Sequence, residues 1–398
     1  MITPALRRKT EEKREERGYT DTMSEERIRI LKGARRILVK IGSGVLTGGD
    51  GLDLDILEQL VDEISVHSKK GYHFVIVSSG AIASGTHRMG FKKKLKSLPQ
   101  KQAAAAVGQG RLMRVYSQAF GRHGLIPAQI LLTMSDLTDR QRFLNVRNTL
   151  STLMEWGVIP IINENDTVSV EEIKFGDNDN LAAMMANIIE ANLLINLTNT
   201  EGLYDRDPRR SEGSRLIPLV REITAQIEDA ASSEADTVGM GGMRSKVIAA
   251  KKVTAFGIPY IIGHGKKAGI VGEILSGRET GTLFLPGTQH LKSKKHWIAF
   301  TLRSRGKIVI DDGARDAIRN QGKSLLPSGV VSVEGDFGVG DPVTCVDAHC
   351  VSIAKGLVNY SSSDINKIRG LNTSRIEQIL GEKPYDEIIH RDNMAVSQ

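Results

Sequence analysis

Residues 35–44 read Arg35-Arg36-Ile37-Leu38-Val39-Lys40-Ile41-Gly42-Ser43-Gly44, an apolar run that stops at a glycine-rich turn. The pattern predicts a buried strand from Arg35 to Ile41, which Gly42-Ser43-Gly44 would break. Apolar residues with helical spacing follow between Leu54 and Ile64. A buried strand that leads into a helix is the repeating unit of an α/β fold.

The same alternation continues along the chain. Short apolar runs that we expect to be further strands are Phe74–Val77, Ile126–Leu132, Val158–Ile162, Leu193–Leu197 and Ile258–Ile262. Helical periodicity fills most of the gaps, including an alanine-rich helix over residues 99–121. This order predicts an α/β fold, a three-layer sandwich with a mostly parallel central sheet covered on both faces. In such sheets ligands bind beyond the carboxyl ends of the strands.

The character of the sequence changes after Pro286, where a polar and basic linker, residues 287–295, begins. The expected strands beyond it are Trp297–Leu302, Lys307–Ile310, Pro342–Val346 and Cys350–Leu357, with helices at Ala314–Asn320 and Ser363–Arg369. This pattern is typical of a separate small β-rich domain. We therefore expect a charged tail over residues 1–34, a main domain over 35–288, and the linker with its small domain over 289–398.

The composition is that of a globular protein with 398 residues, 40% of them hydrophobic, and a net charge of +7. We expect no membrane span, because no run of about 18 apolar residues occurs. An apolar leader is also missing, and two cysteines are typical of a reduced cytoplasmic protein, so we expect Cys345 and Cys350 to be small buried side chains. The positive charge suits phosphate-bearing ligands or RNA. Residues 1–36 hold 11 Lys or Arg against 7 Asp or Glu, which predicts a solvated tail.

Two polar clusters, Asn163 to Asp166 and Asp177 to Asn180, lie between an apolar run and an alanine-rich helical stretch. Acids there could bind an ammonium group or Mg²⁺, and amides could bind a carboxylate. The other interpretation is ordinary loop polarity with a helix N-cap, which Asp and Asn also favour. Either cluster alone leaves both interpretations open.

Glycine-rich loops follow the expected strands at three places. Lys40 precedes Gly42-Ser43-Gly44, small residues fill Ser78 to Gly85, and Gly239 to Lys246 leads into a helix. Glycine lets backbone N–H groups approach a phosphate, and a helix N-terminus attracts anions. The loops, two lysines and the polar clusters together indicate phosphoryl transfer. The sequence has neither the P-loop motif nor a Gly-x-Gly-x-x-Gly after a strand, so we expect neither a P-loop enzyme nor a nicotinamide enzyme.

From about Arg35 to Gln398 the chain resembles the amino acid kinase family with a C-terminal PUA domain. The motifs that carry the resemblance are residues 39–44, 79–82, 163–166, 176–180 and 241–246. The resemblance implies the amino acid kinase fold and transfer of the γ-phosphoryl group of ATP to the side-chain carboxylate of L-glutamate, with Mg²⁺. It also implies a place at the start of proline synthesis, feedback inhibition by proline and a homo-oligomer.

The resemblance also implies the roles of individual residues. The catalytic residues would be Lys40, Lys246 and Asp179. The glutamate site would comprise Ser79, Asn163, Asp166 and Asn178, with Asp166 binding the ammonium group. The ATP site would comprise Lys40, Gly42, Thr198, Asn199, Met240, Gly241, Gly242, Met243, Arg244, Ser245 and Lys246. A carboxylate with a pKa of about 4.3 is already ionised at pH 7, so the reaction needs no general base.

Two positions depart from the family pattern. Asn199 stands where we expect Asp, and Met240 where Thr is common; both changes concern nucleotide contacts. One alternative is a family member that acts on acetylglutamate or uridylate, but neither offers the free ammonium that Asp166 would bind. Another is an RNA-binding protein that uses the PUA-like domain, which the basic linker residues Lys292, Lys294 and Lys295 leave open.

Overall fold

The computed structural model describes residues 25–48, 51–91, 95–169, 178–209, 211–231, 242–286, 302 and 304–397. The chain divides into two compact units, residues 1–289 and 290–398. The expected boundary between 288 and 289 lies one residue from this division. No helix of the described residues is long and apolar enough to cross a membrane.

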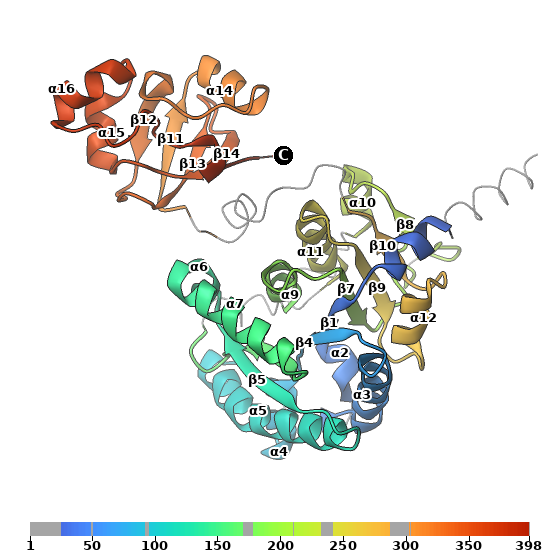
Figure 1. Ribbon diagram of the computed structural model, residues 1–398. Helices are drawn as coiled ribbons and strands as arrows, with labels where there is room; N and C mark the ends of the chain where they lie inside the picture. Colours follow the sequence, from blue (N-terminus) through green and yellow to red (C-terminus); the bar gives the residue numbers. More distant parts are fainter. Residues whose placement is uncertain are drawn as a thin grey trace, which may run out of the picture. The chain divides into compact units, whose positions relative to one another are not determined.

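The first unit is built on an eight-stranded sheet with the order β5-β6-β4-β1-β7-β9-β10-β8 (Figure 1). Its strands are β1 (Arg36–Ile41), β4 (His73–Val77), β5 (Pro127–Leu132), β6 (Ile159–Glu164), β7 (Leu193–Thr198), β8 (Leu219–Val220), β9 (Tyr260–His264) and β10 (Thr282–Phe284). All neighbouring strands are parallel except the antiparallel pair β9 and β10. The expected mostly parallel sheet is confirmed.

Helices cover both faces of this sheet and give the expected three layers (Figure 1). The helices are α2 (Ser43–Leu46), α3 (Leu54–Ser68), α4 (Ala81–Arg88), α5 (Leu98–Gly121), α6 (Met134–Thr138), α7 (Arg140–Glu155), α9 (Asn178–Ile188), α10 (Ala225–Ala230), α11 (Met243–Ala255) and α12 (Ile270–Ser276). Side chains of α3, α5 and α12 form one apolar core with the sheet, and those of α9 and α11 form a second core on the opposite face. A two-stranded ribbon of β2 (Thr47–Gly48) and β3 (Gly51–Leu52) stands apart from the main sheet.

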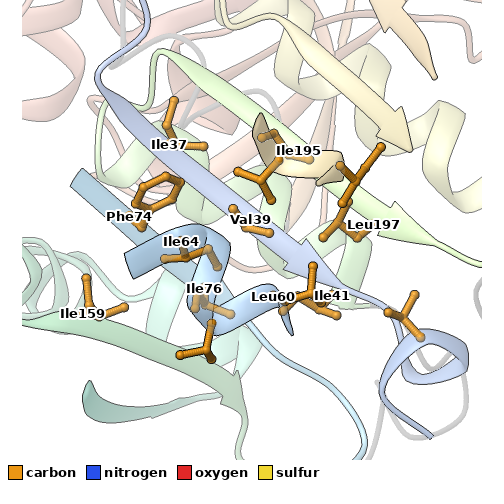
Figure 2. Packing of buried hydrophobic residues seen from close by; sticks show 14 of the residues in the cluster. Ile37, Val39, Ile41, Leu60, Ile64, Phe74, Ile76, Ile159, Ile195 and Leu197 are labelled. Carbon is orange, nitrogen blue, oxygen red and sulfur yellow. The ribbon is translucent and has the colours of Figure 1, made fainter. Parts of the chain in front are cut away.

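The alternation of side chains along β1 determines the face of the sheet on which its lysine, Lys40, lies. Ile37, Val39 and Ile41 pack into the core below α3 and α5 (Figure 2), whereas Leu38 belongs to the opposite core. Successive side chains of a strand point to opposite faces, so Lys40 shares the face of Leu38. That face is the one that α9 and α11 cover.

The described part of the first unit begins before Arg35. Residues 25–32 are helical, and Leu31 is buried in the core shared with α3. The buried guanidinium of Arg27 donates hydrogen bonds to the carbonyl oxygens of Pro218 and Thr280. The charged composition predicted a solvated tail to residue 34, but these contacts join the last ten of those residues to the main domain.

Among its described residues, the second unit has a five-stranded sheet with the order β12-β11-β13-β14-β15 and three α-helices. Its elements are β11 (Gly306–Ile310), α14 (Asp312–Arg319), β12 (Val330–Glu334), β13 (Pro342–Val346), β14 (Ser352–Leu357), α15 (Ser362–Ile368), α16 (Ile376–Leu380) and β15 (Met394–Val396). It has an apolar core of its own. The expected β-rich domain is confirmed, although the pattern missed β12 and β15, and the strand expected at 297–302 lies outside the described residues except for Leu302.

The two cysteines differ in their surroundings. Cys345 lies buried in β13, and burial raises the pKa of its thiol to about 12. Cys350 is exposed, which corrects our expectation for that residue. The reason is local: Asp347 closes a turn between β13 and β14 by accepting hydrogen bonds from the backbone N–H groups of His349 and Val351, and Cys350 lies in that turn with a φ of 61°.

Candidate active site

The carboxyl ends of four adjacent strands, β6, β4, β1 and β7, border a cavity of about 680 Å³. This is the position that a parallel sheet covered on both faces predicts for a ligand. The predicted site residues that line the cavity are Lys40, Gly42, Ser79, Asn163, Asp166, Asn178, Thr198, Asn199 and Lys246. Residues far apart in the sequence therefore lie around one cavity. The alternative interpretation, ordinary polar loops, does not require them to come together.

A buried carboxylate joins the two predicted catalytic lysines. The Nζ atom of Lys40, at the end of β1, lies 2.5 Å from Oδ1 of Asp179 in the first turn of α9. The Nζ atom of Lys246, in the first turn of α11, lies 3.2 Å from Oδ2 of the same carboxylate. All three side chains are almost completely buried. Two cations against one anion leave a net positive charge beside the cavity, where it can attract the phosphates of a nucleotide.

Further hydrogen bonds fix the Asp179 carboxylate between the lysines. Oδ2 accepts from the hydroxyl of Ser245 at 2.7 Å, and Oδ1 accepts from the Asn196 amide at 2.8 Å. Burial alone would raise the pKa of Asp179, but the charges of Lys40 and Lys246 outweigh it and hold that pKa well below its usual range. Asp179 therefore stays ionised and sets the positions of both ammonium groups.

Asn196 was not among the predicted residues, although the sequence holds a signal for it. It is the polar residue in the apolar run Leu193–Leu197, and it is fully buried. It pairs with Lys40 in the β1–β7 register, so both side chains point to the face that α9 covers. A polar side chain inside a buried strand needs hydrogen-bond partners, and here the Asn196 amide donates to Asp179 and to the Tyr260 hydroxyl.

The amide side chains form a second network. The amide nitrogen of Asn178 donates to the Ser78 carbonyl at 2.7 Å, the Ser79 hydroxyl at 3.0 Å and the Asn163 side-chain oxygen at 3.1 Å. The amide nitrogen of Asn163 in turn donates to the side-chain oxygen of Gln109 at 2.9 Å. Gln109, on α5, was also missed by the sequence analysis because it is one polar residue within a long helix. The network orients the amides that border the cavity.

Asp166 lies in the turn that follows β6. The turn is closed by backbone bonds from Val168 and Ser169 to the carbonyl of Asn165, both 3.1 Å long. The hydroxyl of Ser169 also donates to the Glu164 carboxylate at 2.6 Å. Asp166 is half-buried and lines the cavity, so the polar cluster of residues 163–166 serves both as a turn and as part of the site.

The predicted ATP residues lie at the ends of β1 and β7 and at the start of α11. The backbone N–H of Gly42 donates to the Leu197 carbonyl at 3.0 Å, and the Thr198 hydroxyl donates to the Asn199 side chain at 3.3 Å. α11 begins after Gly242, whose lack of a side chain leaves the helix N-terminus open to an anion.

Six of the predicted ATP residues have another outcome. Four of them, Gly242, Met243, Arg244 and Ser245, are described but are not among the residues that line the cavity. Met243 packs against the core between α9 and α11, and Arg244 is exposed. Met240 and Gly241 lie outside the described residues.

Known proteins resemble this chain in sequence over most of its length. The family model described as amino acid kinase family matches residues 35–264, and the PUA domain model matches residues 306–380. The protein named glutamate 5-kinase of Syntrophus aciditrophicus (strain SB) is 69% identical over 374 residues, which cover 94% of this chain and 97% of that relative. The glutamate 5-kinase of Geobacter sulfurreducens is 52% identical over 92% of this chain and 99% of its own length. Among solved structures, carbamate kinase from Giardia lamblia bound to AMP-PNP has a TM-score of 0.46 at 18% identity, covering 64% of this chain and 100% of that one.

Proposed function

This chain belongs to the amino acid kinase family, and we propose that it transfers the γ-phosphoryl group of ATP to the side-chain carboxylate of L-glutamate. The observation that carries the proposal is a single cavity lined both by Lys40 and Lys246, which the buried Asp179 joins, and by Asp166. The cluster suits a transferring phosphoryl group, and Asp166 suits the ammonium group of a free amino acid. Relatives named glutamate 5-kinase, at 69% and 52% identity, support this choice of substrate.

The proposed reaction forms one bond and breaks one. An oxygen of the glutamate side chain attacks the γ-phosphorus, and the bond from that phosphorus to the bridging oxygen of ADP breaks. The products are ADP and glutamyl 5-phosphate. The attacking carboxylate is already ionised, so the protein has no proton to remove. The barrier lies in bringing two anions together, and Lys40 and Lys246 would lower it by neutralising the phosphoryl oxygens.

The described residues bear on how Mg²⁺ would be held. They contain no group of three or more His, Cys, Asp or Glu side chains arranged to hold a metal ion. The buried carboxylate of Asp179 is already shared by two lysines. Mg²⁺ commonly binds through substrate phosphates and water, with few protein ligands. The site therefore fits a Mg²⁺ ion that arrives on ATP and neutralises part of the phosphate charge.

An assay of ATP turnover with four acceptors tests the proposal directly. Glutamate, acetylglutamate, aspartate and uridylate would be compared side by side with the purified full chain. We expect turnover with glutamate far above that with the other three. Preference for acetylglutamate or uridylate would assign the chain to another branch of the same family and remove the role given to Asp166.

Asp166→Asn is expected to raise KM for glutamate on the order of 10–100-fold, because a hydrogen bond between charged groups is worth about 1.5–3 kcal/mol. KM for ATP should stay the same, since Asp166 follows β6 and the nucleotide residues follow β1 and β7. Steady-state kinetics with each substrate varied in turn gives both values. Asp62→Asn, an exposed acid paired with His123, is a matched control that should change neither. Unchanged KM for glutamate in the Asp166 variant would reduce this residue to a turn former.

We also propose that the reaction begins proline synthesis in the cytoplasm and that proline inhibits it. Proline carries the same ammonium and carboxylate as glutamate, so it could occupy an overlapping site. The Asp166→Asn assays therefore have a second readout. Inhibition by proline should weaken together with glutamate binding, and inhibition that persists unchanged in the variant would mean a separate proline site.

The first unit alone should phosphorylate glutamate. Each described residue of the proposed chemistry lies within residues 1–289, and the second unit has its own core. A fragment of residues 1–289, checked for folding by circular dichroism, should keep turnover close to that of the full chain. A folded but inactive fragment would mean that the second unit, or an oligomer it supports, completes the site. RNA binding by the full chain but not by the fragment would favour the alternative role of the second unit.

A further inference from the structure

The proposed function leaves one charge of the substrate without an oppositely charged partner. Glutamate carries an ammonium group and two carboxylates. Asp166 accounts for the ammonium, and Lys40 and Lys246 lie where the phosphoryl group meets the side-chain carboxylate. The α-carboxylate has so far only amide partners, and burying a carboxylate without a cation or strong hydrogen bonds is costly.

Lys101, on the fourth residue of α5, lines the same cavity. Lys40, Lys246 and Lys101 are its lining lysines among the described residues, and the first two are held by Asp179. Within the described part of the chain no carboxylate lies at ion-pair distance from Lys101. It is half-buried, so its charge is partly shielded from water. A partly desolvated lysine that faces a ligand cavity favours an anionic partner.

Two contacts place Lys101 on the substrate side of the cavity. The side chain of its neighbour Gln102 donates to the Ser169 carbonyl at 3.2 Å, which ties the start of α5 to the turn that holds Asp166. α5 also packs against α4, the helix that begins just after Ser79 (Figure 1). The contact is so close that a Cβ built on Gly85 would lie 1.8 Å from the Ala104 carbonyl oxygen. The nucleotide residues, in contrast, follow β1 and β7.

The structure of an amino acid explains why the closeness of the Asp166 and Lys101 segments matters. The ammonium and the α-carboxylate are attached to one carbon, so their partners must be neighbours in space. Asp166 and Lys101 both line the cavity, and the Gln102–Ser169 bond holds their segments together. We propose that Lys101 binds the α-carboxylate of glutamate and is a specificity-determining residue of this site. The inference rests on the proposed function.

The test compares two acceptors that differ only at the α-carboxylate. Glutamate and its α-amide, isoglutamine, share the ammonium group and the side-chain carboxylate that receives the phosphoryl group. The full-length wild type should prefer glutamate. In Lys101→Met, kcat/KM for glutamate should fall about 10–100-fold, the loss expected for one charge-assisted contact, while kcat/KM for isoglutamine stays unchanged. The preference for glutamate should thus collapse, and KM for ATP should not move.

Three further variants serve as controls for this comparison. Lys101→Arg keeps the cation and should retain part of the preference for glutamate. Lys96→Met changes an exposed lysine that is not among the residues lining the cavity, five positions away, and should behave as the wild type. Lys101→Gln serves as a second neutral variant should the Met variant fold poorly.

The outcomes separate the inference from the function it rests on. Equal losses with glutamate and isoglutamine would give Lys101 a general structural role and overturn the inference. A raised KM for ATP with the preference intact would assign Lys101 to the nucleotide and also overturn it. In both cases the wild type still phosphorylates glutamate. A wild type that does not phosphorylate glutamate overturns the proposed function itself, and the inference with it.

Discussion

Lys246→Ala is expected to lower kcat on the order of 10²–10³ while KM for glutamate changes far less. The lysine lies in the first turn of α11, and its ammonium is fixed by Asp179. A charge held at a fixed point acts most strongly where negative charge grows, which is in the transition state rather than in bound glutamate. Steady-state kinetics with saturating ATP measures both parameters.

A lysine on the same helix provides the control for this variant. Lys251 is exposed and pairs with Glu228, also exposed, at 2.7 Å. Such surface ion pairs contribute little to stability, so Lys251→Ala should keep the kcat and the KM for glutamate of the wild type. Lys246→Arg would test geometry apart from charge, because a guanidinium has a different shape and hydrogen-bonding pattern. A folded Lys246→Ala protein with nearly normal kcat would exclude the assigned role.

Asp179→Asn should reduce both activity and stability. The change leaves Lys40 and Lys246 buried without their shared anion, and removing one partner of a buried ion pair costs about 3–5 kcal/mol. The lysines would also lose the group that fixes their positions, so kcat should fall. Urea unfolding gives the free energy of unfolding, and kinetics on the folded fraction gives kcat. Inorganic phosphate should stabilise the variant more than the wild type, since a bound anion would replace the missing charge.

The matched control for Asp179→Asn is Asp55→Asn. Asp55 also lies in the first turn of a helix, α3, but it is exposed. It therefore reports the effect of a first-turn acid alone, which is about 0.3–1 kcal/mol. If Asp179→Asn lost no more stability than this and kept its kcat, the buried carboxylate would not organise the site.

The sequence predicted the longer strands of the sheet well because each is a mostly apolar run, whereas the short strands β8 and β10 were not predicted. Residues 193–197 and 342–346 lie within strands that extend by no more than one residue beyond those limits. β6 was predicted to end at Ile162 but continues through Asn163 and Glu164. Polar residues usually mark the end of an apolar strand, but here Asn163 and Glu164 are the last residues of the strand and border the cavity. The sequence pattern therefore predicted the site residues just after the strand instead of at its end.

The residues of the site could be predicted from the sequence more readily than the contacts between their side chains. Lys40 and Lys246 lie at glycine-rich loops and Asp179 lies in a polar cluster, and the family resemblance implied their catalytic roles. The carboxylate of Asp179 contacts both lysines because α9 and α11 cover the same face of the sheet. This arrangement belongs to the tertiary structure and cannot be derived from local sequence patterns. Gln109 and Lys101 are two of several polar residues in a 24-residue helix. Helical periodicity alone does not distinguish a polar side chain that faces the cavity from one that faces solvent.

The contact between α4 and α5 limits how the substrate range of this protein can change. A Cβ on Gly85 or on Gly108 would lie 1.8 Å from a backbone oxygen of the facing helix. The two helices therefore touch backbone to backbone, with no side chain between them whose trimming could let them slide. Ser79, at the entry to α4, and Lys101, on α5, are then carried by what behaves as one rigid wall. A longer or shorter acceptor would have to be accommodated by exchanging side chains on that wall, because its two halves have no room to move independently.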